Sequence, residues 1–536
     1  MLDFLKAEKK IRQKQEWKPI DIPEILGLSH CKYLYHGHLD ERLQAKFSAY
    51  AARNEMPDPL IMMYAPKGNF SLRLLARPQL LDWIIYEAIG DWIYAQIRKS
   101  DPAIFSRSFS YKMFDKPGIK HWLEFVEHCK SLYNNGYSYA VTSDLTGYFD
   151  NIRIDELISH LKRYMPDSAE NKKVLFALEH MLSVWSNNSC SMAGYGIPQG
   201  PDASYLLGDI FLYPIDEQMR QHKHYFRYVD DIRIFCKEEL ELKISLMDLT
   251  KCLRASGLNI NAKKTRFLKQ RKVEELFDPL SSEMASINVR FKKGHRDEIL
   301  KLTPRVESML CLSLEADPFE QQHFRFAMWK LCQLAGSDMA HNETKIFDLI
   351  ENNFYSKPHY ADNFCKYFSL FSKNHRVIGF LIKFLHSREN IYEWQETIAI
   401  RCLLSLNRKF LGQQLSGNDL TFFLRSAADK EKGVVSRAHY CLLAGQYGGQ
   451  EARATLAKMY FDETDDYIKA AIIISVQEMD KINQDAFYLK ICENRSSSYM
   501  QALIGHIKTL KSPLYFWIGS KPKLNSPEYY YVVSLP

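Results

Sequence analysis

The chain has 536 residues, of which 46% are hydrophobic and 25% are charged, and its formal net charge is +7 at pH 7. This composition is that of a globular protein and excludes a disordered chain, and the length is enough for roughly three or four domains. Residues 1–19 lack the apolar core of a signal peptide, and the longest aliphatic cluster, at 470–476, is far shorter than the ~20 residues of a membrane span. We therefore expect a cytoplasmic protein with no contact to a membrane.

The eleven cysteines never form a Cys-x-x-Cys pair, and most lie in apolar runs. This spacing favours reduced thiols in the core over zinc ligands or disulfides.

Residues 1–55 form a polar, helix-prone N-terminal arm. Its early part carries the cations Lys6, Lys9, Lys10, Arg12, Lys14 and Lys18. Packing and contact with nucleic acid are both open as its role.

Residues 56–135 begin with a predicted hairpin at 65–73, which is followed by a helix at 80–97. The hairpin carries the cations Lys67 and Arg73. Two exposed loop cations would be unremarkable alone, but cations are also what a triphosphate requires.

Residues 136–290 contain three motifs with acidic or rigid positions. A strand-like run from Tyr139 delivers Asp144 at its end and passes into a helix, whose apolar face is formed by Ile154, Leu157, Ile158 and Leu161. A rigid loop at 196–201 then opens a helical run at 203–219.

The third motif is a predicted β-hairpin at 225–236 with Asp230 and Asp231 in its turn. Two adjacent like charges repel each other, so either a cation offsets the repulsion or the turn is fully solvated.

Asp144, the Pro198-Gln199-Gly200 loop and the Asp230-Asp231 hairpin, in this order, resemble the palm of the reverse transcriptases. The resemblance implies an α+β fold of right-hand polymerase type, with fingers at 56–135 and palm at 136–290. It also implies an RNA-directed DNA polymerase that uses dNTPs.

Nucleotidyl transfer of this kind uses two divalent ions ~3.5–4 Å apart, held by carboxylates from different strands. We expect Mg²⁺, with Mn²⁺ as the alternative, because both ions prefer oxygen ligands. The expected metal ligands are Asp144, the Leu145 carbonyl, Asp230 and Asp231.

The resemblance also assigns residues around the metals. Lys264, in a block at 257–265 similar to one of the family, lies near the departing pyrophosphate and is expected to act as its acid. The expected nucleotide-binding residues are Lys67, Arg73, Phe149, Gln199, Gly200 and Tyr228. A further block at 105–111 resembles one along the template path.

Phe149 lies five positions after Asp144, where the family places an aromatic steric gate against the ribose 2′-hydroxyl. The alternative is a core aromatic at a strand-to-helix turn. The gate implies deoxynucleotide substrates.

Two features depart from the family. Pro201-Asp202 follows the glycine of the loop, where small or apolar residues are common. Asp202 either caps the following helix or opposes a template phosphate. In addition, no three-helix thumb is recognisable after the palm.

The run 263–272 carries six cations and no acid, which favours contact with phosphates over a solvated face. Residues 300–515 consist of amphipathic helices in which segments at 400–404, 439–443 and 469–473 echo one another. The spacing between these segments is typical of a HEAT-like helical repeat, and irregular helical packing is the alternative. Residues 516–536 form a C-terminal tail.

A helical-repeat tail behind such a palm is most similar to the bacterial abortive-infection and defence-associated reverse transcriptases. This implies a homo-oligomeric, antiphage DNA polymerase that works with or without a template, either RNA or DNA. Chains would start on a protein tyrosine, giving DNA covalently attached to the enzyme, and the candidates are Tyr33, Tyr35, Tyr529, Tyr530 and Tyr531. The alternatives are a reverse transcriptase that copies one specific RNA, and a palm that serves as a nucleic-acid or phage sensor.

Overall fold

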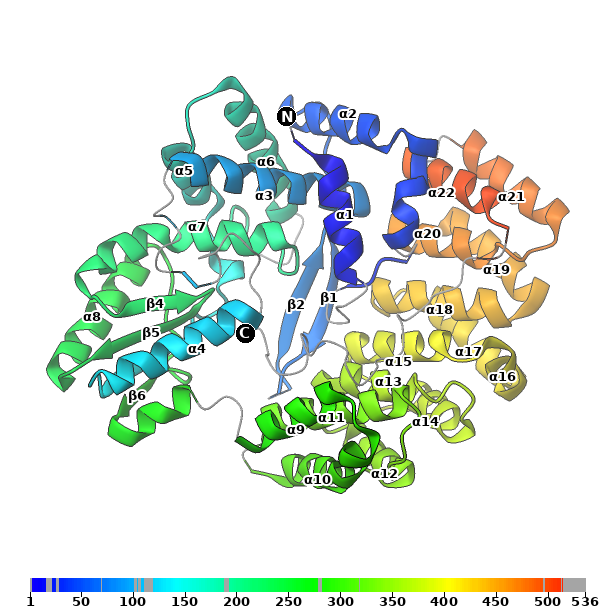
Figure 1. Ribbon diagram of the computed structural model, residues 1–536. Helices are drawn as coiled ribbons and strands as arrows, with labels where there is room; N and C mark the ends of the chain where they lie inside the picture. Colours follow the sequence, from blue (N-terminus) through cyan, green and yellow to red (C-terminus); the bar gives the residue numbers. More distant parts are fainter. Residues whose placement is uncertain are drawn as a thin grey trace.

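The computed structural model describes residues 2–15, 22–25, 28–68, 70–100, 104, 108–109, 119–187, 192–277, 282–317, 319–494, 497–511 and 513. In Figure 1 a small sheet with its helices lies on one side, a long hairpin lies in the centre, and a curved array of helices borders the hairpin on the other side.

The N-terminal arm packs on the fingers and on the far C-terminal helices. It contains helix α1 (Phe4–Gln15), 3₁₀ helix η1 (Leu28–Gly37) and α2 (Leu39–Ala51). The region predicted as the fingers, called the fingers below, contains β1 (Ile61–Pro66), β2 (Leu72–Arg77), α3 (Leu80–Ser100) and α4 (Ile119–Asn134). Strands β1 and β2 form an antiparallel hairpin in which Pro66 pairs with Leu72.

The region predicted as the palm, called the palm below, is built on a four-stranded antiparallel sheet with the strand order β4-β5-β3-β6. Its strands are β3 (Tyr139–Ser143), β4 (Tyr225–Tyr228), β5 (Asp231–Cys236) and β6 (Arg266–Lys269). Its helices are η3 (Phe149–Asn151), α5 (Ile154–Tyr164), α6 (Ala169–Asn187), α7 (Asp202–Gln218), η4 (Met219–Gln221), α8 (Glu239–Ala255) and η5 (Gln270–Leu276). All four apolar positions predicted for the face of α5 are buried, as the 3.6-residue period requires.

Every helix described after the palm belongs to the C-terminal array. They are α9 (Ser282–Lys293), α10 (Arg296–Glu315), α11 (Gln321–Gly336), α12 (Glu343–Phe354), η6 (Pro358–Tyr360), α13 (Ala361–Phe368), α14 (His375–His386), α15 (Glu393–Ser405), α16 (Arg408–Gln414), α17 (Gly417–Ala428), α18 (Val434–Tyr447), α19 (Gly449–Asp462), α20 (Asp466–Ser475), α21 (Lys481–Glu493) and α22 (Ser498–Thr509). The three echoing segments lie in α15, α18 and α20, and α18 packs against both of the others. The C-terminal region is therefore helical, as predicted.

The central hairpin is held from two sides. On one side, the Ala76 amide donates a 3.3 Å hydrogen bond to the Gln199 carbonyl of the palm. On the other side, β1 packs against α15, α18 and η6 of the C-terminal array (Figure 1).

The N-terminal arm adds a third connection, because Glu24 accepts a 2.8 Å ion pair from Arg77 of β2. The neighbouring Pro23 carbonyl accepts a 2.6 Å hydrogen bond from Tyr467 of α20. The fingers, the N-terminal arm and the C-terminal array thus form one connected unit.

Helices α18 and α20 cross closely at Gly445. A Cβ atom at this position would lie 2.3 Å from the Ser475 carbonyl oxygen and 2.5 Å from the Ser475 Cβ. The contacting atoms belong to the backbone and the first side-chain atom, so they have little freedom to move.

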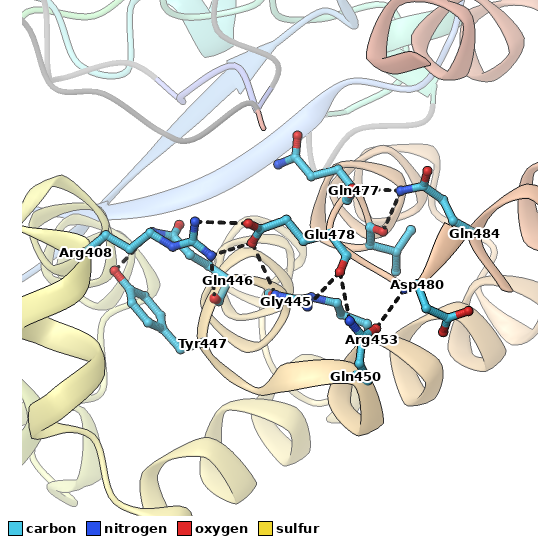
Figure 2. Close-up of polar contacts among 11 residues, drawn as sticks. Arg408, Gly445, Gln446, Tyr447, Gln450, Arg453, Gln477, Glu478, Asp480 and Gln484 are labelled. Carbon is cyan, nitrogen blue, oxygen red and sulfur yellow. Dashed lines mark hydrogen bonds and ion pairs between the residues drawn. The ribbon is translucent and has the colours of Figure 1, made fainter. Parts of the chain in front are cut away.

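A polar cluster fastens the helices around this crossing (Figure 2). The Glu478 carboxylate, in the connection after α20, accepts from Arg408 of α16 at 3.1 Å and from Arg453 of α19 at 3.2 Å. Arg453 also donates to the main-chain carbonyls of Glu478, at 2.8 Å, and Gly445, at 2.9 Å. The cluster therefore joins α16, α18 and α19 to the connection that follows α20.

Gly445→Ala is expected to lower the free energy of unfolding by about 3 kcal/mol, because the added methyl group overpacks a fixed backbone contact. Chemical denaturation of the full chain measures this change. Gly379→Ala is the matched control, because a Cβ on that helical glycine meets no heavy atom within 4 Å. Equal effects of the two substitutions would contradict the close crossing.

His439 of α18 makes the stability of the helical array dependent on pH. The side chain is fully buried, its Nδ1 lies 2.7 Å from the Val435 carbonyl, and the charged Arg401 lies nearby. Burial, followed by the charge of Arg401, lowers the pKa of His439 to about 3. The unfolded chain, with a His pKa of about 6.5, therefore binds this proton more readily than the folded chain between these two values.

The free energy of unfolding is thus expected to be unaffected by His439 above about pH 6.5 and to fall as the pH decreases below it. At pH 5 the loss due to His439 alone is about 2 kcal/mol. Denaturation curves at pH 7.5 and pH 5 measure the loss. His439→Gln is expected to reduce the difference between the two curves, and an unchanged difference would contradict the assignment.

Candidate active site

The sheet brings Asp144 to the turn between β4 and β5. Ser143 pairs with Ile232, and Tyr228 pairs with Asp231, so the residue after β3 lies beside the Val229-Asp230 turn. The loop before β6 fixes this position, because the Asn261 amide donates a 2.7 Å hydrogen bond to the Asp144 carbonyl.

The carboxylates of Asp144 and Asp230 are hydrogen-bonding neighbours. Burial, followed by the charge and the hydrogen bond of Asp144, raises the pKa of Asp230 well above that of an ordinary aspartate. Two facing carboxylates of this kind require a proton or a cation between them. Carboxylate oxygens are the hard ligands that divalent ions such as Mg²⁺ prefer.

Asp231 has a different environment from Asp230. Its Oδ2 lies 3.5 Å from the guanidinium of Arg233, and Thr142 also bonds its side chain. Burial raises the pKa of Asp231, and the charge of Arg233 partly offsets this effect. Arg233 is itself buried over the ring of Phe125, at 4.3 Å. Asp231 is therefore directed towards a fixed protein cation.

Within the described part of the chain, no three His, Cys, Asp or Glu side chains are arranged to hold a metal ion. The structure brings together two of the predicted carboxylate ligands, and Leu145 follows directly in the chain. Metal binding by Asp231 remains a prediction.

Positive charge gathers around the Asp144 carboxylate. The Lys264 ammonium contacts Asp144 Oδ2, although the lysine side chain is largely exposed. Burial, followed by the charges of Arg73 and Lys264, lowers the pKa of Lys67 at the fingertip. The predicted cations Lys67, Arg73 and Lys264 therefore lie close enough to influence one another, beside Asp144 and Asp150.

Asp150 was not predicted as a site residue. Burial raises its pKa, and the charges of Lys67 and Arg73 partly offset this increase, so the carboxylate lies near the fingertip. Its position directly after Phe149 was the only available signal in the sequence.

Phe149 lies against α7. Its ring packs edge-on against Tyr205, with 5.3 Å between centroids, and only 7% of the residue is exposed. A Cβ at Gly208 would lie 3.5 Å from the ring. Helix α7 therefore holds the ring in place, and the role of Phe149 as a steric gate stays a prediction.

The Gln199-Gly200 loop is held by a buried acid that sequence reasoning missed. Glu87 of α3 accepts hydrogen bonds from the amides of Asp202, at 2.8 Å, and Ala203, at 3.2 Å. Helix α7 begins at Asp202 with Pro201 as its N-cap, and there is no side-chain cap. The expectation that Asp202 caps this helix is therefore wrong, because Glu87 satisfies the free amides from a distant helix.

Tyr228 is fully buried, and its ring packs edge-on against Trp122 at 5.3 Å. It presents no surface to a nucleotide in this structure. The tyrosine supports the turn from inside the core, and a direct role in nucleotide binding is only a prediction.

Two of the candidate priming tyrosines, Tyr33 and Tyr35, lie in the described part of the chain, on η1 of the N-terminal arm. Tyr33 is 52% exposed and stacks on His506 of α22, while Tyr35 is half-buried. Their helix, η1, packs against α1, α2 and α22. Tyr529, Tyr530 and Tyr531 lie outside the described residues.

Part of the chain matches a known protein family. Residues 79–276 match the family model described as reverse transcriptase (RNA-dependent DNA polymerase). The match begins just before α3 and runs through the palm to the end of η5. Residues 79–276 are thus similar to a reverse transcriptase domain, the domain of RNA-dependent DNA polymerases.

Solved structures similar to the chain include two telomerases. The first is apo telomerase from Candida tropicalis truncated from the C-terminal domain, with 12% identity and a TM-score of 0.28, covering 44% of this chain and 56% of that one. The second is telomerase from Candida albicans in complex with the TWJ fragment of telomeric RNA, with 11% identity and a TM-score of 0.33, covering 76% and 74%. This chain thus spans little more than half of the first structure.

No curated protein sequence matches the chain. None of the helices in the described part of the chain is both long and apolar enough to cross a bilayer.

Proposed function

We propose that Asp144 and Asp230 are the catalytic, metal-binding pair of a polymerase that joins dNTPs into DNA. The observation that carries this proposal is the contact between two carboxylates from different strands, with Lys67, Arg73 and Lys264 around them. A bound Mg²⁺ would activate the attacking hydroxyl and neutralise charge on the phosphate.

The chain's own residues have distinct tasks in this proposal. Asp144 and Asp230 hold the cation, and Asp231 and the Leu145 carbonyl complete its surroundings. Lys67 and Arg73 bind the triphosphate, and Lys264 gives a proton to the departing pyrophosphate. Phe149 excludes ribose, and Gln199 and Gly200 contribute to nucleotide binding.

The test is incorporation of labelled dNTPs by the purified full chain, with and without an added RNA or DNA template, in Mg²⁺ and in Mn²⁺. We expect incorporation only with a divalent ion. Absence of incorporation under all of these conditions would contradict the proposal and favour a sensor function.

We further propose an antiphage, abortive-infection role for this polymerase. The resemblance of its organisation to defence-associated reverse transcriptases supports this role, because a helical array follows the palm and packs on the fingers. We also propose that this array is a HEAT-like repeat that mediates homo-oligomerisation. Light scattering that finds only a monomer at micromolar concentration would contradict the last point.

Protein priming gives a separate prediction. A tyrosine hydroxyl can replace a 3′-hydroxyl if it reaches the metal site, and Tyr33 is the more exposed of the described candidates. Purified protein is expected to carry DNA that survives denaturation and is removed by nuclease, and Tyr33→Phe is expected to carry at least roughly tenfold less, since the attacking hydroxyl is lost.

Tyr392→Phe, at a half-buried tyrosine of the helical array, is the control and should retain the DNA. DNA-free wild-type protein that extends only added primers would contradict priming by the protein. Extension restricted to an RNA template would instead favour the alternative of a reverse transcriptase for one RNA.

A further inference from the structure

Arg227 of β4 is a fully buried cation two residues before Val229. Val229 and Asp230 form the turn between β4 and β5, which is called the catalytic turn below. Its guanidinium donates to both oxygens of Asp216, through Nε at 2.9 Å and Nη2 at 2.8 Å. It also donates through Nη1 to Asp209 Oδ1 at 2.5 Å and through Nη2 to the Asp209 carbonyl at 3.0 Å. Both acids belong to α7, so Arg227 joins the sheet to this helix.

The two acids are held in turn by hydroxyl groups. Tyr225 donates a 2.7 Å hydrogen bond to Asp216, and Ser108 donates a 2.6 Å hydrogen bond to Asp209. The Arg227 carbonyl accepts a 2.8 Å hydrogen bond from the amide of Phe109. A buried network of this size has few alternative arrangements, because each lost contact would leave a desolvated polar group.

One contact leaves the network towards the catalytic turn. Nη1 of Arg227 donates a 3.2 Å hydrogen bond to the carbonyl of Val229. Val229 has φ of 55°, in the left-handed region that a β-branched residue rarely adopts. Such a conformation persists only where the surrounding structure holds it.

The next residue after Val229 is Asp230, so the conformation of Val229 sets the direction of the Asp230 carboxylate. If the Val229 carbonyl were released, the turn would relax towards an ordinary backbone conformation. Asp230 would then move relative to Asp144, which is anchored separately through Asn261.

We propose that Arg227 is a positioning residue for DNA synthesis, which holds the Val229 carbonyl so that Asp230 faces Asp144. The proposal rests on the proposed function of Asp144 and Asp230 as the metal-binding pair. It assigns to the Asp209–Arg227–Asp216 network the task of keeping a strained turn in its active conformation.

The test compares Arg227→Lys, which keeps the charge but loses the planar fork, with the double variant Arg227→Lys/Val229→Gly. Arg227→Lys is expected to lower kcat roughly 10- to 100-fold, which is the rate factor that corresponds to the backbone strain at Val229. It should also raise the Mg²⁺ concentration that gives half of the maximal rate. The dNTP KM should stay nearly unchanged. The double variant should have a kcat at least about tenfold higher than that of Arg227→Lys alone, because glycine accepts positive φ without support.

Arg437→Lys is the matched control. This buried arginine of α18 pairs with Glu463 at 2.6 Å, far along the chain from the palm. It should lower the melting temperature without changing the Mg²⁺ dependence. Activity loss in Arg227→Lys that parallels melting temperature, and that Val229→Gly does not reverse, would overturn the proposal.

If Arg227→Lys does not fold, Asp209→Asn provides the second test, because it removes one charge while Arg227 remains bound to Asp216. It should raise the Mg²⁺ requirement at least roughly threefold, reversed by Val229→Gly, and an unchanged requirement would overturn the proposal. Asp230→Asn is measured in the same assay. If Asp230→Asn stays active, the proposed function fails; if it is inactive while Val229→Gly rescues neither variant, only the positioning role fails.

Discussion

Asp230→Asn is expected to reduce dNTP incorporation by roughly 10³-fold or more, because an amide is a poor Mg²⁺ ligand and metal ions contribute several kcal/mol to charge stabilisation. Asp144→Asn should have the same effect, since the two carboxylates face each other. A primer-extension or terminal-addition assay in Mg²⁺ measures the rates. Full activity in either variant would contradict the assignment of this pair.

The loss should occur without loss of folding. Asp230 has a raised pKa in the folded chain, so its ionisation costs stability as the pH rises through that pKa. A neutral asparagine of nearly equal size removes this cost, and the melting temperature at pH 8 without metal should be equal to or above that of the wild type. Asp167→Asn, at a largely exposed acid before α6, is the control and should retain activity.

Phe149→Ala is expected to reduce the preference for dNTPs over rNTPs by roughly 10²-fold, since the preference depends on a steric clash with the 2′-hydroxyl. The preference would depend on the fixed position of the Phe149 ring, which packs against Tyr205 and close to Gly208. The ratio of kcat/KM for the two nucleotides measures the effect.

Loss of a buried ring also lowers the free energy of unfolding by about 3–5 kcal/mol. Phe149→Ala and its control must therefore be assayed well below their melting temperatures. Phe291→Ala removes a fully buried ring of α9 and is the matched control. It should be destabilised but keep the dNTP preference. An unchanged ratio in Phe149→Ala would leave Phe149 as an ordinary core aromatic.

The sequence was sufficient to predict the palm. The hairpin with Asp230, the strand ending at Asp144 and the apolar face of α5 all depend on short-range patterns, and the reverse transcriptase match confirms the domain. The helical nature of the C-terminal region was predictable for the same reason.

The supports of the site were not predictable. Glu87 caps a helix 115 positions away, and Ser108 bonds Asp209, which lies 101 positions further along. Neither contact leaves a periodic signal, because it depends on how distant elements pack. Tyr228 shows the same limit, since its place in the motif could not reveal that the ring is turned into the core.

The packing of the β1–β2 hairpin against the helical array has a thermodynamic consequence. The tip of the hairpin lies against η6, where a Cβ at Gly68 would come within 3.5 Å of the His359 ring, and β1 rests on α15 and α18. Any movement of the hairpin towards a nucleotide must change these contacts. If the hairpin binds dNTP as proposed, dNTP affinity and the conformation of the helical array are linked. The coupling is then reciprocal: a molecule that binds the array and changes dNTP affinity by some factor has its own affinity changed by dNTP by the same factor.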